Sequence, residues 1–181
     1  MQQQLSPGKY IISKGALLPF HECLINEDWK KGGLATVVIS KKMPSGKIIV
    51  GLYLIDMYCL GLKDTSYKFA FSAFDYAEFL NELNKRHAMI ICELNFVHNL
   101  IYGAIDYAEN LRFISYKDFK ITEHLLNPGL IDDGIDEIEF GMNGKPMFVA
   151  GPYDDIKRII GILERNVGAG NYEYIMFGDE M

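Results

Sequence analysis

Reactive and charged side chains follow directly on the most apolar stretch of the sequence. Residues 48–55 form its longest uninterrupted apolar run, and Asp56, Cys59, Lys63 and Asp64 come shortly after it. A thiol beside a lysine has a lowered pKa and can act as a nucleophile, and residues presented at the end of a buried strand are often functional. Cysteine is also among the most buried residue types, so packing is the competing interpretation and the one we favour for Cys59.

A polar stripe on a predicted helix supplies a candidate base for that thiol. His98, Tyr102 and Asp106 are spaced by four residues, which places them on one side of a helix. Under the catalytic hypothesis this helix packs beside the first hairpin, and His98 activates Cys59 with Asp56 or Asp106 in support. The simpler alternative is a half-buried histidine that bonds a neighbouring carbonyl or side chain.

A turn-rich segment over residues 140–155 contains two further polar candidates, Lys145 and Tyr153. Its Gly141-x-x-Gly144-Lys145 spacing is too short for a phosphate-binding loop, and Pro146 stands where such a loop has Ser or Thr. We therefore expect a structural turn here that leads into the last helix. The candidate binding side chains of the whole chain are Lys63, Asp64, Tyr102, Lys145 and Tyr153.

The histidines and cysteines are scattered without the spacing of a metal site or a CxxC pair. They are His21, His87, His98, His124, Cys23, Cys59 and Cys92. An acidic run over residues 132–139 lacks the spacing of a calcium loop and is expected to be a solvated loop and strand face. We expect free thiols, no metal site and no cofactor.

Hydrophobic patterning predicts one clear β-hairpin and three main helices. Residues 34–41 and 47–56 flank a Pro44-Ser45-Gly46 turn. The second of these strands does not alternate in polarity, so we expect it to be covered on both faces. The helices are expected over residues 72–86, with Ser72 as N-cap, over residues 94–112 and over residues 154–167.

Weaker signals predict the remaining elements. A second hairpin is expected from residues 135–140 and 147–150 around Asn143-Gly144, with a short helix over residues 117–126 and an edge strand over residues 172–177. Residues 89–92 fit a strand or the lead-in to a helix. Gly103 disfavours its helix by about 1 kcal/mol relative to Ala, so we expect another element to approach closely there.

These elements predict a single α+β domain over residues 34–181. Both hairpins contribute to a mainly antiparallel sheet, which packs against three or four helices. Residues 1–33, rich in Gly and Pro, are expected to be an irregular N-terminal segment. A chain of 181 residues that is 49% apolar is long enough to bury a real core.

The charge distribution along the chain indicates whether nucleic acid is an expected partner. The net charge of −6 combines +4 over residues 1–50 with −10 over residues 51–181. The N-terminal lysines fall around the predicted hairpin, where lysine protects sheet edges, so nucleic acid is not the expected partner.

The apolar runs are too short to cross a membrane, and the start lacks a secretory pattern, so we expect a cytoplasmic protein. A protein partner or a second copy of the chain fits the 13% aromatic content.

Three segments are the most distinctive parts of the chain: YLIDMYCLGLKD (residues 53–64), LIYGAIDYA (residues 100–108) and FGMNGKPMFVAGP (residues 140–152). Together they make residues 34–170 resemble a family of uncharacterised bacterial proteins. The resemblance implies a bacterial cytoplasmic protein and carries no activity, cofactor or site residue.

The sequence therefore predicts a non-catalytic binding or protein-interaction domain, because no complete catalytic or metal motif is present. The alternative is a small cysteine-dependent hydrolase or transferase that uses Cys59 and His98. Convergence of the three distinctive segments on a cleft would favour the enzyme, whereas convergence in the core would make them architectural.

Overall fold

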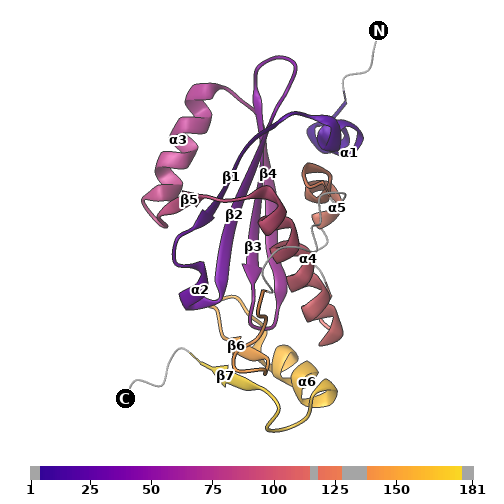
Figure 1. The fold of residues 1–181 in the computed structure, drawn as a ribbon. Coiled ribbons are helices and arrows are strands. Elements are labelled where there is room, and N and C mark those ends of the chain that lie inside the picture. Colours follow the sequence, from indigo (N-terminus) through magenta and orange to yellow (C-terminus); the bar gives the residue numbers. More distant parts are fainter. Residues whose placement is uncertain (1–4, 115–117, 128–137, 177–181) are drawn as a thin grey trace.

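A five-stranded antiparallel sheet in the order β4-β3-β2-β1-β5 lies at the centre of the computed structural model (Figure 1). The structure describes residues 5–114, 118–127 and 138–176. The strands of this sheet are β1 (Phe20–Asn26), β2 (Leu34–Lys42), β3 (Ile48–Asp56), β4 (Gly61–Phe71) and β5 (Met89–Ile91). A separate parallel pair consists of β6 (Met147–Val149) and β7 (Glu173–Ile175).

Helices cover both faces of the sheet. They are α1 (Pro7–Lys14), α2 (Trp29–Gly32), α3 (Ala73–Asn84), α4 (Leu94–Asn110), α5 (Phe119–Thr122) and α6 (Ile156–Asn166), with short 3₁₀ turns η1 (Gly15–Leu17) and η2 (Glu123–Leu125). This arrangement confirms the α+β class. Among the described residues, no helix is both long and apolar enough to span a membrane.

The two faces of the sheet bury different helices, because side chains alternate along each strand. Val37 and Tyr53 point to the face on which Ile101 of α4 packs. Val38 points to the other face, where it meets Tyr76 of α3. Helix α1 and the α5–η2 turn cover the rest of the α4 face, and Figure 1 shows α3 on the opposite side.

The first predicted hairpin and the long helices are confirmed. Strands β2 and β3 pair in continuous register from Leu34↔Asp56 to Lys42↔Ile48, and β3 lies between β2 and β4. Ser72 caps α3 in a capping box: its hydroxyl accepts from the Asp75 amide, and the Asp75 carboxylate accepts from the Ser72 amide.

The prediction that residues 1–33 are irregular is wrong. Residues 7–32 contain α1, β1 and α2. Pro7 occupies the first turn of α1 behind Ser6, where a missing amide costs nothing, so this proline begins a helix and does not interrupt one. Strand β1 is buried between β2 and β5, and its stability comes from two partners that are distant in sequence.

The second predicted hairpin is only partly present. Asn143 and Gly144 form the tight turn with positive φ values of 53° and 75°, and a bridge joins Met142 to Lys145. Strand β6 pairs in parallel with β7 and not with the preceding segment, of which residues 138–140 are not strand and residues 135–137 lie outside the described residues. The edge strand expected near residue 174 is thus the partner of β6.

Candidate functional site

The three distinctive segments of the sequence meet at one end of the sheet. The Gly141 amide donates to the Met57 carbonyl over 2.9 Å, and the Met147 amide donates to the Tyr58 carbonyl over 3.1 Å. These two bonds join the turn after β3 to the loop before β6. The same loop contacts α4 through Phe140, so segments far apart in sequence form one packed junction.

Gly103 is the point of closest approach between α4 and that loop. A β-carbon at this position would lie 2.7 Å from the Phe140 ring, which is closer than such contacts occur. The Phe140 ring also stacks on Tyr107, with centroids 5.8 Å apart. The prediction that Gly103 admits a neighbouring element is confirmed.

Asp56 holds the turn that follows β3. Its Oδ1 accepts hydrogen bonds from the amides of Tyr58 (2.9 Å) and Cys59 (3.0 Å). Burial raises the pKa of the carboxyl, while these amides and Lys63 act in the opposite direction. The geometry makes Asp56 a cap for the turn.

Cys59 lies in a closed apolar cluster with no exposed surface. Its neighbours there include Leu111, Phe148 of β6 and Leu163 of α6. Burial, with a smaller contribution from Asp56, raises the pKa of the thiol. A neutral thiol sealed from solvent is a poor nucleophile.

His98 lies in a different part of the core. Its imidazole is fully buried, and Nε2 accepts a hydrogen bond from the Asn127 amide over 3.0 Å. Burial lowers its pKa to about 4. From His98 to Leu111, which packs in the Cys59 cluster, α4 advances about 20 Å at 1.5 Å per residue. The structure therefore does not bring Cys59 and His98 together.

Lys63 and Asp64 are neighbours on β4 with different environments. Lys63 Nζ pairs with Asp154 Oδ2 over 2.7 Å, and the same oxygen accepts from the Gly151 amide over 2.7 Å. This ion pair joins β4 to the turn before α6. Asp64 is exposed on the edge strand.

The other three expected binding residues are dispersed. Tyr102 is half-buried against Phe119, with ring centroids 6.1 Å apart. Lys145 donates to the Gly170 carbonyl over 2.9 Å and thereby holds β6 near β7. Tyr153 is 99% exposed. These side chains do not share a site.

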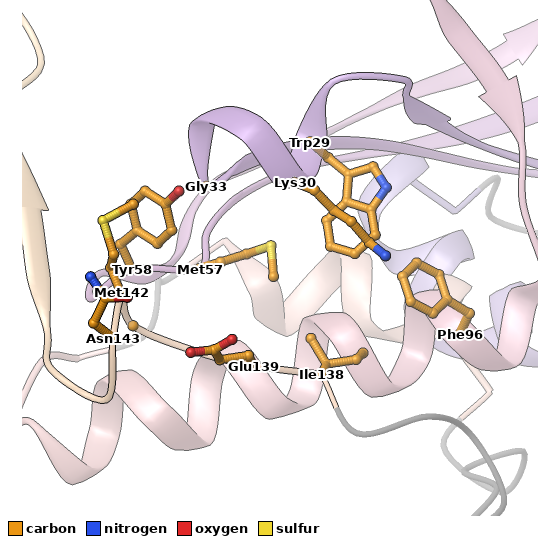
Figure 2. A pocket seen from close by; sticks show the side chains of 11 residues that line it. Trp29, Lys30, Gly33, Met57, Tyr58, Phe96, Ile138, Glu139, Met142 and Asn143 are labelled. Carbon is orange, nitrogen blue, oxygen red and sulfur yellow. The ribbon is translucent and has the colours of Figure 1, made fainter.

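A pocket of about 490 Å³ opens beside the junction, between α2, the turn after β3, the start of α4 and the loop before β6. Five of its eleven lining residues are aromatic or contain sulfur, and three more have charged or amide side chains (Figure 2). Its lining side chains include Trp29, Lys30, Met57, Tyr58, Phe96, Ile138, Glu139, Met142 and Asn143.

The two ends of the pocket differ, as Figure 2 shows. Trp29 and Phe96 form one end, where their rings are tilted by 56° with centroids 5.3 Å apart. Lys30 lies over the Trp29 ring with Nζ 5.2 Å from its centroid, a cation–π contact. Tyr58 and Met142 lie at the other end.

Gly33 allows the Tyr58 ring to pack against the end of α2, where both residues line the pocket. It ends α2 with φ +65°, and a β-carbon there would lie 2.3 Å from the Tyr58 ring. Its carbonyl accepts from the Met57 amide over 2.8 Å. A larger residue at this position would displace Tyr58, so this glycine sets the distance between α2 and the turn after β3.

Sequence reasoning missed most of this pocket. Met57 and Tyr58 belong to the distinctive segment of residues 53–64, in which the sequence patterns singled out only the polar and thiol side chains. Trp29 is the single tryptophan of the chain and is followed by Gly32-Gly33, and this pairing is the one local signal that marks the site. Phe96 lines the pocket only because the first turn of α4 lies beside α2, and no local sequence signal predicts that placement.

Within the described ranges, no group of three or more His, Cys, Asp or Glu side chains is arranged to hold a metal ion. Comparison of the chain with protein-family models, curated proteins and solved structures gives no match.

Proposed function

We propose that this protein is a non-catalytic binding domain whose site is the pocket between Trp29, Tyr58, Phe96 and Met142. The ligand we propose is a small molecule with a flat or apolar body and a charged or polar group. The pocket itself is the observation that carries this proposal.

The size and composition of the pocket support a small-molecule ligand. Binding sites for such ligands usually measure about 300–1,000 Å³ and combine apolar walls with a few polar groups. Here the volume is about 490 Å³. Trp29 and Phe96 offer ring faces for stacking, and Met142 offers an adaptable apolar contact. Lys30 and Glu139 supply one charge of each sign at the same site.

The placement of the reactive groups favours binding over catalysis. Cys59 and His98 are buried in other parts of the molecule and do not line the pocket. Asp56 is engaged by two backbone amides. We include in the proposal a reducing, cytoplasmic setting, because the three cysteines of the sequence lack a CxxC pair and the even number of a disulfide framework.

Trp29 provides a direct test, because it is the only tryptophan and lines the pocket. The amphipathic probe 1-anilinonaphthalene-8-sulfonate is titrated into the full chain, and energy transfer from Trp29 to the probe is measured. We expect saturable binding of one probe per chain. Phe96→Ala and Met142→Ala should each weaken it about tenfold, because each removes apolar contact area from the probe.

Tyr153→Ala is the matched control, because Tyr153 is an exposed aromatic residue outside the pocket. It should leave the affinity for the probe unchanged, and circular dichroism should show that all variants are folded. The proposal is wrong if the folded protein transfers no energy to the probe, or if the pocket variants bind as tightly as the control.

A further inference from the structure

Two of the three cysteines, which are far apart in sequence, are neighbours in the sheet. Cys23 lies on β1 and Cys92 directly follows β5. Their sulfur atoms are 3.4 Å apart, which is a thiol–thiol hydrogen bond, and the Cys92 amide donates to the Cys23 carbonyl over 3.1 Å. Leu24 pairs with Ile91 in the antiparallel register, so Cys23 and Cys92 stand directly opposite each other.

The geometry of this pair is suitable for a disulfide. Opposed residues of antiparallel strands have α-carbons about 4.5–5.5 Å apart, and disulfides commonly join α-carbons about 4.4–6.8 Å apart. The sulfur atoms are already in contact, so side-chain rotation brings them to bonding distance without a change in strand pairing. Cys59 lies in a different cluster and does not share this arrangement.

The two thiols differ in access to solvent and in ionisation. Cys23 is buried, whereas Cys92 is only partly buried at the edge of the sheet. The hydrogen bond between them lowers the pKa of Cys92 and raises that of Cys23, as expected when the Cys23 S–H donates to a Cys92 thiolate. Burial and, to a smaller extent, Glu93 oppose ionisation of Cys92, and burial, Glu22 and Glu93 oppose that of Cys23. The more accessible sulfur is thus also the one whose pKa is lowered.

We propose that Cys92 and Cys23 are a peroxide-reactive dithiol site, in which Cys92 is the sulfur attacked first and Cys23 is the resolving thiol. The Cys92 thiolate attacks one oxygen of hydrogen peroxide, the O–O bond breaks, and a sulfenic acid and hydroxide form. The Cys23 sulfur then bonds to the Cys92 sulfur, and the sulfenic oxygen leaves as water. Overall, two thiols and one peroxide give one disulfide and two waters, and the two electrons pass from sulfur to peroxide.

The disulfide would tie β1 to the residue that leads into α4. Strand β1 continues towards Trp29, and α4 carries Phe96, so the two aromatic residues at one end of the pocket lie on the elements that become linked. The chemistry itself does not depend on a pocket ligand. Failure of the probe titration would leave this inference intact, and the reverse also holds.

The test uses the full chain, reduced, freed of reductant and treated with excess hydrogen peroxide at neutral pH. Non-reducing peptide mass spectrometry should find a Cys23–Cys92 cross-link that dithiothreitol reverses, while Cys59 stays free for alkylation after denaturation. We expect Cys92 to be oxidised at least about tenfold faster than Cys59 in the same molecule. Because this measurement needs no mutation, a variant that fails to fold does not affect it.

Two substitutions of Cys23 distinguish its role as the resolving thiol from its role as a hydrogen-bond donor to Cys92. Cys23→Ser keeps a hydrogen-bond donor but no resolving sulfur, so sulfenic acid at Cys92 should accumulate and be trapped by dimedone. Cys23→Ala also removes the donor, so the sulfenic acid should form more slowly. The inference is overturned if peroxide leaves all three thiols free, if the cross-link involves Cys59, or if Cys92→Ser leaves the oxidation rate of Cys23 unchanged.

Discussion

The turn after β3 separates two regions with opposite character. Met57 and Tyr58 contribute to the open pocket beside Trp29, whereas Cys59 enters the closed cluster around Phe148 and Leu163. Consecutive residues of one short turn therefore line an open pocket and a closed core. The difference shows that the chemical reactivity of a side chain was a poor guide to its exposure: the thiol is sealed, and the pocket-lining residues of the turn are a methionine and a tyrosine.

Truncation of one aromatic ring in each region should give the largest contrast. Phe148→Ala should lower the free energy of unfolding by about 3–5 kcal/mol, because it opens a cavity in a fully buried cluster. Phe96→Ala should cost only about 1–2 kcal/mol, because its ring is partly in contact with solvent already. Urea denaturation measures both values, and equal losses would contradict the division into a closed and an open region.

The pH dependence of stability should test whether His98 is buried as a neutral imidazole. Burial holds the pKa of His98 at about 4, below its ordinary value of 6.5, so the unfolded chain binds this proton more readily than the folded chain. The contribution of His98 to the free energy of unfolding is therefore complete above about pH 6.5 and is lost as the pH falls towards 4, by up to about 3 kcal/mol. Denaturation curves at several pH values measure this loss.

His98→Gln is the control for that experiment. Glutamine does not titrate, and its side-chain carbonyl offers an acceptor for the Asn127 amide in place of Nε2. The variant should lose less stability than the natural protein between pH 6.5 and 4.5. An identical slope in both proteins would show that His98 is not a buried neutral imidazole.

Thiol alkylation should show how completely the region around Cys59 is closed to solvent, with the partly buried Cys92 as reference. With iodoacetamide at pH 7.5, in the absence of denaturant and peroxide, Cys92 should react readily, and Cys59 at least about a hundredfold more slowly than an unfolded thiol. Peptide mass spectrometry locates the label. Rapid labelling of Cys59 would reopen the hypothesis of a cysteine-dependent enzyme.

The smallest contrast concerns two lysines at the junction. Lys63→Met should cost about 1–2 kcal/mol, because it leaves the largely buried Asp154 carboxylate without its cation. Lys145→Met should cost less than about 0.5 kcal/mol, because its bond to the Gly170 carbonyl is exposed. Thermal or urea unfolding distinguishes them, and a larger loss for Lys145 would reverse the assignment of the buried ion pair.

Local patterns predicted the elements that carry their own signals. The β2–β3 hairpin has adjacent strands and a marked turn, and α3 has a capping box within four residues. Strand β1 was missed because its sequence FHECLIN mixes polar and apolar residues without clear alternation, and because its partners, β2 and β5, come from different parts of the chain. The parallel pairing of β6 with β7 was missed because Asn143-Gly144 indicates a hairpin, and the local turn did form without a second strand beside it.

The sequence by itself determined the α+β class, the main hairpin, the long helices and the close approach at Gly103, because each depends on periodicity, turn chemistry or the size of one residue. Tertiary structure decided which polar residues meet. It buried Cys59, left His98 in another part of the core, and paired Cys23 with Cys92. The physical reason is that pairing across a sheet and packing between elements join residues without regard to sequence distance, so neither the pocket nor the thiol pair has a continuous pattern in the chain.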